Sequence, residues 1–190
     1  LELTADLIKD DTLEINPTTR YRTDTEFHIF DFESGTNLGF LSGNNSSLDI
    51  EQTDDPAVFN AAINEGNFGR VILNSTSPYW SARTTYGAVP AFPQLGVEVY
   101  LEVDYHTTLD VVTGVISFHN GGIVNNPNVQ FNGQDPADGP VVWKKIYIDM
   151  QTIISGSPGG SDFEITFESI LPEGQTSGEI NIDNVKVVHL

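Results

Sequence analysis

Two carboxylates, Glu102 and Asp104, stand two positions apart in the segment EVYLEVDYH, residues 98–106. In a β-strand, residues two apart point to the same face, so these carboxylates would lie side by side. A pair of carboxylates that flanks a glycosidic bond can hydrolyse it. The same face also carries Tyr100, and an aromatic ring beside carboxylates can instead bind a sugar without cleaving it.

Hydrolysis would need a further carboxylate that this strand does not supply. Glycosidases of the laminarinase type carry the pattern Glu-x-Asp-x-x-Glu on one strand, and the position of the last Glu falls on Thr107. A hydroxyl cannot shuttle the proton that the missing carboxylate would transfer. We therefore expect no catalytic residue on this strand by itself. A glycoside hydrolase of jelly-roll type stays open as an alternative if another strand, for example at Asp149, supplies the second group.

Two groups of aromatic residues have the character needed to stack on a sugar. Pyranose rings present apolar C–H faces, which an aromatic ring covers while carboxylates such as Glu102 and Asp104 bind the hydroxyl groups. The first group shares strand faces with polar residues and consists of Tyr100, Trp143 and Tyr147. The second group lies in SPYWSARTTYG, residues 77–87, and consists of Tyr79, Trp80 and Tyr86. Packing against the sheets is the alternative for each ring, because aromatic residues are common in strands.

Strands must position these side chains, because short segments of period two recur between turn-forming residues. We expect strands near residues 12–15, 25–33, 47–51, 69–75, 79–86, 96–106, 110–119, 128–131, 142–150, 161–169 and 178–188. The best candidate for a helix is DPAVFNAAINEG, residues 55–66, where Pro56 follows an Asp cap and Gly66 ends the segment. The pattern predicts an all-β sandwich or barrel with at most one short helix.

The last expected strand, GEINIDNVKVV, changes its parity. Ile180 and Ile182 are even-numbered, whereas Val185 and Val187 are odd-numbered. An extra residue at Asp183–Asn184 explains this shift and predicts a β-bulge. The bulge either only adds twist or turns Asp183 or Asn184 toward a specific partner.

Charge limits the partners of the chain. Its 190 residues include 8 Lys and Arg against 27 Asp and Glu, which gives a formal net charge of −19. This charge repels nucleic acid and anionic membranes, and it suits hard cations such as calcium. Asp31 and Glu33 in FDFES, together with Asp183 near the other end, would form a calcium site if the first and last strands are neighbours.

The chain length favours a single domain over residues 1–190, with residues 1–11 as a loosely held N-terminal arm. No apolar segment approaches the roughly 20 residues that span a bilayer. Cysteine is absent, which excludes disulfides and thiolate metal sites. The first residue is Leu1 rather than Met, so we expect a processed chain that has lost a leader peptide.

Three segments resemble a known family: FHIFDFESG (27–35), VVWKKIYIDMQTIIS (141–155) and GEINIDNVKVV (178–188). They are similar to the jelly-roll, carbohydrate-binding-module-like domains of Bacteroidetes surface lipoproteins and polysaccharide-utilisation proteins. FDFE resembles the first core strand of such modules, and IDNVKV resembles their closing strand. Residues 35–95 match no part of that family.

The resemblance implies a galactose-binding-like sandwich of two antiparallel sheets, exported and held at the cell surface, that binds a glycan without cleaving it. It implies a structural calcium between the first and last strands, with Asp31, Glu33 and Asp183 as ligands. It also places sugar sites either on a concave sheet face or in the loops at one end, and it implies a lipid anchor outside this sequence. A structural or adhesion module that packs on a protein partner is the remaining alternative.

Overall fold

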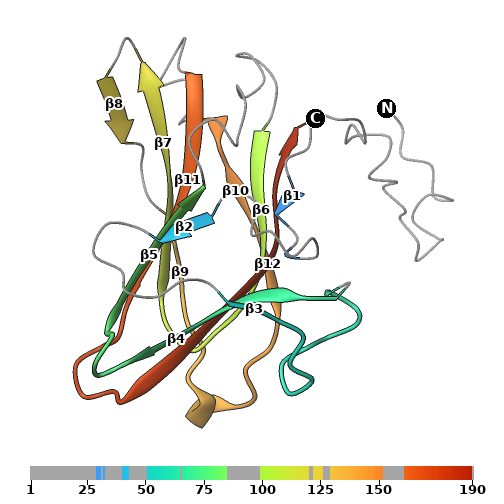
Figure 1. The fold of residues 1–190 in the computed structure, drawn as a ribbon. Helices are drawn as coiled ribbons and strands as arrows, with labels where there is room; N and C mark the ends of the chain where they lie inside the picture. The colour runs from blue at the N-terminus through green and yellow to red at the C-terminus, as the bar shows by residue number, and fades with distance from the viewer. Residues whose placement is uncertain are drawn as a thin grey trace, which may run out of the picture.

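The computed structural model describes residues 29–30, 32, 40–42, 51–64, 66–84, 99–119, 122–125, 129–151 and 161–189. Over these residues the chain forms two six-stranded sheets that face each other as two layers (Figure 1). Their paired strands run antiparallel. The all-β class and the jelly-roll sandwich expected from the sequence are therefore confirmed. No helix in this part of the chain is long and apolar enough to cross a membrane.

The two sheets are built from strands that are distant in the sequence. The first sheet has the order β10 (Lys144–Asp149), β6 (Val99–Thr107), β12 (Ser177–His189), β4 (Phe68–Asn74) and β3 (Glu51–Thr53), and β1 (Ile29–Phe30) also pairs with β12. The second sheet has the order β2 (Phe40–Ser42), β5 (Tyr79–Thr84), β11 (Ser161–Ile170), β7 (Val111–His119) and β8 (Gly122–Asn125), and β9 (Val129–Phe131) also pairs with β7. A single 3-10 turn, η1 (Pro136–Asp138), lies before β10.

Alternation along the strands decides which side chains fill the space between the sheets. On β6, Leu101 and Val103 are almost fully buried in this core, and on β11 Ile165 and Phe167 meet them from the other layer. The core also contains Trp80, Ala82, Val71, Leu73, Ile180, Ile182, Val185, Val187, Ile148 and Met150. The residues of opposite parity on each strand point to the outer faces of the sandwich.

The expected strands from 69–75 onward have counterparts with slightly shifted ends. The strands expected near 25–33 and 47–51 lie mostly outside the described residues and overlap β1 and β3 only in part, and the one near 12–15 lies wholly outside them. β2 and β8 were not predicted from the sequence. The prediction of a helix over 55–66 was wrong, because the structure has two separate turns there. Asp55 Oδ1 accepts from Ala57 N, and Asn60 Oδ1 accepts from Ala62 N, at 2.9 and 3.0 Å. These local bonds compete with helix formation.

The expected bulge in β12 is confirmed. The register between β12 and β6 shifts between Asp183 and Lys186, and Asn184 has a φ of 47°. The Asn184 N–H donates to Asp183 Oδ1 at 2.7 Å, and its side-chain amide donates to the carbonyl of Ile63 at 3.0 Å. The bulge therefore does more than add twist, because it directs Asn184 to a loop on the outer face of the first sheet.

Replacement of Asn184 by alanine is expected to lower the free energy of unfolding by about 2 kcal/mol. Alanine tolerates the left-handed backbone poorly, and it removes the bond to Ile63, each effect being worth about 1 kcal/mol. Asn184→Gly removes only the bond, so its loss should be about 1 kcal/mol. Urea unfolding of both variants measures the difference; equal losses would show that the backbone conformation carries no cost.

Candidate functional site

The outer face of the first sheet gathers the polar residues of four strands. The register places Lys145 opposite Asp104, Tyr147 opposite Glu102, and Asn181 opposite His106. We call this surface the polar face. Its members are Arg70 of β4; Tyr100, Glu102, Asp104 and His106 of β6; Lys145, Tyr147 and Asp149 of β10; and Glu179, Asn181, Asp183 and Lys186 of β12.

A cluster of two lysines and two carboxylates occupies the middle of the polar face. Lys145 Nζ forms an ion pair with Glu102 Oε1 and lies 3.3 Å from Asp104 Oδ2. Lys186 Nζ lies 3.0 Å from the same oxygen of Glu102. Glu102 and Asp104 are only 5% and 2% exposed, whereas the two lysine side chains reach the surface. The carboxylates therefore form a floor, with the ammonium groups above it.

The ionisation of this cluster follows from its contacts. Burial alone would raise the pKa of Glu102, but the hydrogen bonds and charges of Lys145 and Lys186 outweigh burial and hold that pKa below its usual value. Burial would lower the pKa of Lys145, and Glu102 and Asp104 together raise it instead. Burial raises the pKa of Asp104 despite the nearby Lys145. Glu102 and Lys145 are thus both charged at neutral pH.

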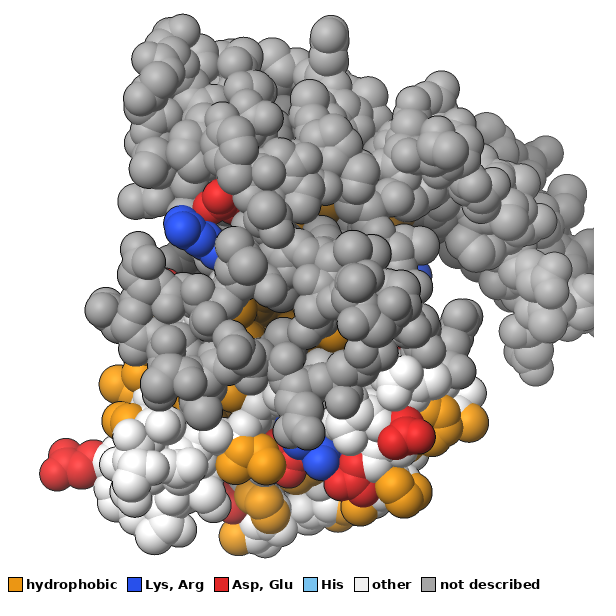
Figure 2. Space-filling view, in the orientation of Figure 1, with side chains coloured by type: hydrophobic (Ala, Val, Ile, Leu, Met, Phe, Trp, Pro, Cys, Tyr) orange, Lys and Arg blue, Asp and Glu red, His pale blue; other side chains and the backbone are white. Residues whose placement is uncertain are grey.

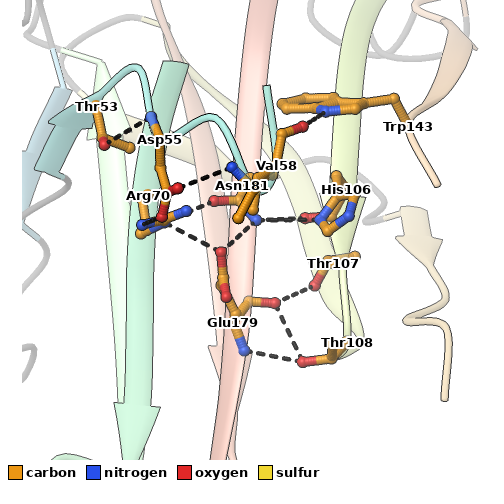
Figure 3. Close-up of polar contacts among 11 residues, drawn as sticks. Thr53, Asp55, Val58, Arg70, His106, Thr107, Thr108, Trp143, Glu179 and Asn181 are labelled. Atoms are coloured by element: carbon orange, nitrogen blue, oxygen red, sulfur yellow. Dashed lines mark hydrogen bonds and ion pairs between the residues drawn. The ribbon is translucent and has the colours of Figure 1, made fainter. Parts of the chain in front are cut away.

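A loop covers the part of the polar face that lies over β4 and β12. We call this loop, residues 54–64, the strap. Asp55 in the strap lies 2.8 Å from Arg70 Nη1, and the Trp143 ring N–H donates to the carbonyl of Val58 at 2.8 Å (Figure 3). At the other end of the strap, Asn64 donates to Asp183 Oδ2 at 2.6 Å. Two strands of the first sheet, β4 and β12, and Trp143 thus fix the strap in place.

A network of polar side chains fills the space beneath the strap (Figure 3). Arg70 Nε lies 3.0 Å from Glu179 Oε1 and donates to Asn181 Oδ1 at 3.2 Å. The Asn181 amide contacts His106 Nδ1 at 3.2 Å, and burial lowers the pKa of His106. His106 is therefore neutral and can accept this hydrogen bond.

A small apolar cluster supports the strap from below. Phe68 is fully buried although it points away from the inter-sheet core. Its ring packs edge-on against Trp143 at 5.5 Å between centroids, and the Arg70 guanidinium lies 5.6 Å from the Phe68 ring centre. Trp143 was predicted to stack on a sugar. Its ring N–H instead binds the strap, and its ring packs on Phe68 beneath the strap.

The other part of the polar face is not covered by the strap. We call it the open strip, which consists of Tyr100, Lys145, Tyr147, Asp149 and Lys186. Tyr147 is 52% exposed, and Asp149 is exposed at the end of the same edge strand. The half-buried Tyr100 pairs with Asp149 while Tyr147 pairs with Glu102, so the two tyrosines are diagonal neighbours on adjacent strands. Such neighbours are about 7–8 Å apart, within reach of one ligand.

The structure separates the predicted ligand-binding residues into three sets. Tyr100, Glu102, Asp104, Trp143 and Tyr147 come together on or beside the polar face, as their parity predicts. Tyr79 lies on the outer face of the second sheet, opposite Ile170. Tyr86 lies outside the described residues.

Trp80 requires a correction. It is fully buried in the inter-sheet core, next to Ala82 and Phe167 in that cluster, so its ring cannot stack on a sugar. On β5 the side chains alternate, and Trp80 shares the inner parity with Ala82, whereas Ser81 and Arg83 take the outer parity. Glu102 and Asp104, which were expected to bind sugar hydroxyl groups, lie buried beneath Lys145, which contacts both.

The calcium site stays a prediction, because Asp31 and Glu33 lie outside the described residues. Asp183 itself does not suit a cation as it is placed. Its Oδ2 accepts from the Asn64 amide and its Oδ1 accepts from Asn184 N, so N–H donors point at both oxygens. Within the described ranges, no group of three or more His, Cys, Asp or Glu side chains could hold a metal ion.

The arrangement of Glu102 and Asp104 does not suit hydrolysis. A hydrolytic pair needs one protonated group at the leaving oxygen and one group facing the sugar ring or a water molecule. Here Lys145 contacts both carboxylates from the solvent side, and neither reaches the surface. Glu102 and Asp104 are therefore not placed to act as a hydrolytic pair with each other.

Lys145, Lys186 and Asn64 belong to the site but were not predicted from the sequence. Lys145 and Lys186 could have been found, because both share the outward parity of their strands with predicted site residues. The contact of Asn64 with Asp183 joins residues 119 positions apart. No local sequence pattern indicates this contact. The helix expected over 55–66 also gave no reason to place Asn64 against Asp183.

Comparison with known proteins identifies the fold. No protein-family model and no curated protein matches the chain. A carbohydrate-binding module specific for non-crystalline cellulose, CBM28, has a TM-score of 0.55 at 12% identity, with 82% of this chain and 89% of that chain covered. The xylan-binding CBM22-2 domain from Paenibacillus barcinonensis Xyn10C has a TM-score of 0.53 at 12% identity, with 85% and 98% covered.

A third similar structure is much longer than this chain. The enzymatically active domain of tailspike protein 4 from bacteriophage CBA120 has a TM-score of 0.55 at 12% identity over 84% of this chain, which spans only 20% of that chain. At such identities the likeness shows the fold alone. The chain thus has the β-sandwich fold that these carbohydrate-binding modules share.

Proposed function

We propose that the chain binds a glycan without cleaving it, on the open strip of the polar face. The observation that carries this proposal is Tyr147, whose ring is 52% exposed on a rigid strand directly opposite Glu102. The ring offers an apolar surface to the C–H face of a sugar, and Asp149 and the lysine ammonium groups around it offer partners to hydroxyl groups. The names of the similar structures, a cellulose-specific module and a xylan-binding domain, support a polysaccharide as the ligand.

The strength of this binding follows from the small number of rings. Each ring that stacks on a sugar contributes on the order of 1 kcal/mol, so we expect dissociation constants between micromolar and millimolar. Weak binding of this kind is useful when many modules or many sites act on one polymer.

We also propose that the domain is exported and works at the cell surface of a Bacteroidetes bacterium, held by a lipid anchor outside this sequence. The resemblance of FDFE and IDNVKV to surface lipoprotein modules supports this proposal. The formal charge of −19 agrees with a partner that is not nucleic acid.

Replacement of Tyr147 by alanine is expected to weaken glycan binding about fivefold, because about 1 kcal/mol of stacking is lost. The thermal midpoint should change little, since the side chain is half exposed. Affinity electrophoresis in hydroxyethyl cellulose and arabinoxylan, followed by calorimetric titration, measures the change. Tyr79→Ala, a matched change on the outer face of the second sheet, is the control. Loss of binding in the control but not in Tyr147→Ala would place the site elsewhere.

A further inference from the structure

The cations of the described residues are almost all neutralised by carboxylates. Arg70 contacts Asp55 and Glu179, and Arg83 Nη1 lies 3.5 Å from Glu164. Lys145 and Lys186 both contact Glu102. On the surface drawn in Figure 2, the larger blue patches each lie against red ones. Within this part of the chain Lys144 is the exception, and it takes the inner parity of β10.

Glu102 is the centre of this neutralisation on the open strip. A single oxygen, Oε1, contacts the ammonium groups of both Lys145 and Lys186. The carboxylate lies beneath the two ammonium groups and is 5% exposed, whereas the lysine side chains are 39% and 28% exposed. Any ligand on the open strip therefore meets two cations whose charge Glu102 and Asp104 together balance from below.

We infer that Glu102 sets the charge selectivity of the open strip, so that the strip takes neutral glycans and rejects glycans that carry uronic acids. This inference rests on the proposed function. A uronate over the strip would gain little from two ammonium groups that Glu102 already pairs, and the carboxylate beneath them repels it at short range. The formal charge of −19 adds a long-range repulsion of the same sign.

The change that tests this role is Glu102→Gln. The variant keeps the shape of the side chain but removes its charge. Lys145 then keeps only its ion pair with Asp104, and Lys186 loses its ion pair with Glu102. Two ammonium groups would then face solvent with less compensation. We expect the open strip to become a binding site for uronate-bearing polymers, while Tyr147 continues to stack on neutral ones.

Two pairs of polymers separate charge from backbone. Hydroxyethyl cellulose and carboxymethyl cellulose share one backbone, as do arabinoxylan and glucuronoxylan, and only the second member of each pair is anionic. In affinity electrophoresis at low salt, the wild type should bind the neutral member at least about tenfold more tightly. Glu102→Gln should reduce the ratio of the affinity for the neutral polymer to the affinity for the anionic polymer by about tenfold, because its affinity for the anionic polymer rises. High salt should reverse this rise, because screening weakens ionic contacts.

The control is Glu168→Gln on β11, which changes the net charge equally on the exposed face of the second sheet. It should leave the ratio unchanged; an equal gain in both variants would overturn the inference, because net charge alone would then explain it. The wild-type comparison can overturn the inference even if Glu102→Gln does not fold. Equal or tighter wild-type binding to the anionic polymers would overturn the inference while glycan binding stands. No binding to either member of either pair would overturn the proposed function and the inference together.

Discussion

Replacement of Gly133 by alanine is expected to lower the free energy of unfolding by about 3 kcal/mol. A Cβ at this position would lie 2.6 Å from the backbone N and C of Leu109 and from the backbone C of Thr108. Backbone atoms cannot rotate away, and this turn is fixed on the other side because Gly133 N donates to Asp110 Oδ1 at 2.9 Å. The two segments would have to separate where the loop after β9 packs on the turn between β6 and β7.

Gly178 provides a matched comparison, because a Cβ added there would meet the side chain of Leu109 rather than its backbone. A Cβ on Gly178 would lie 2.5 Å from Leu109 Cγ and 2.7 Å from Cδ1. Gly178→Ala should therefore destabilise the wild type but cost little in a Leu109→Ala background, where the space is open. Gly133→Ala should cost the same in both backgrounds.

Chemical unfolding of the wild type, the three single variants and the two double variants gives the two coupling energies of these cycles. A large coupling for Gly178 and none for Gly133 is expected. Rescue of Gly133→Ala by Leu109→Ala would contradict the close backbone approach that the structure shows.

Replacement of Asn64 by aspartate is the second change with a large expected effect, a loss of about 3 kcal/mol at neutral pH. Asn64 and Asp183 are 2% and 1% exposed, and the amide donates to the carboxylate at 2.6 Å. Aspartate keeps the oxygen that accepts from Asn60 N at 3.0 Å but replaces the donor with a second carboxylate. Two buried like charges at this distance cannot both ionise without a large cost.

The loss should depend on pH in a defined direction. The new carboxylate pair has a pKa in the folded state that is raised above its value in the unfolded chain, because burial and repulsion both favour the protonated form. Protons therefore bind the folded state more tightly. The loss of free energy of unfolding relative to the wild type is largest above the raised pKa. It shrinks as the pH falls through that pKa, since a protonated oxygen can again donate to Asp183.

Asn60→Asp is the control for this experiment, because it makes the same charge change on the strap at an exposed residue whose oxygen already accepts from Ala62 N. Thermal unfolding of both variants between acid and neutral pH should show a deficit at neutral pH for Asn64→Asp alone. Equal stability of the two variants at neutral pH would mean that Asn64 does not donate to Asp183.

The period of two along each strand was sufficient to predict the sandwich, and the parity change in β12 was sufficient to predict its bulge. The same rule could have assigned Trp80 to the core, because it shares its parity with Ala82 on β5. Parity places Glu102 and Asp104 correctly on the outer face of the first sheet. It cannot show whether an outer face is exposed, because that depends on what covers it.

What covers the polar face comes from segments distant in the sequence. The lysine over Glu102 and Asp104 comes from β10, and the strap arrives from the connection between β3 and β4. The strap depends on contacts such as Trp143 to Val58, which joins residues 85 positions apart. A reading of local periodicity contains no information on these contacts, and for this reason Trp143 and Tyr147 appear equivalent in the sequence but differ in the structure.

The central claim is that a neutral glycan binds on the open strip. The most direct measurement is a two-dimensional amide NMR titration with a soluble cello-oligosaccharide and a xylo-oligosaccharide. We predict that the amide signals of Tyr100, Glu102, Lys145 and Tyr147 shift with increasing ligand. Shifts confined to Tyr79, Glu168 and Ile170 on the second sheet, or no shifts with either ligand at millimolar concentration, would contradict the account.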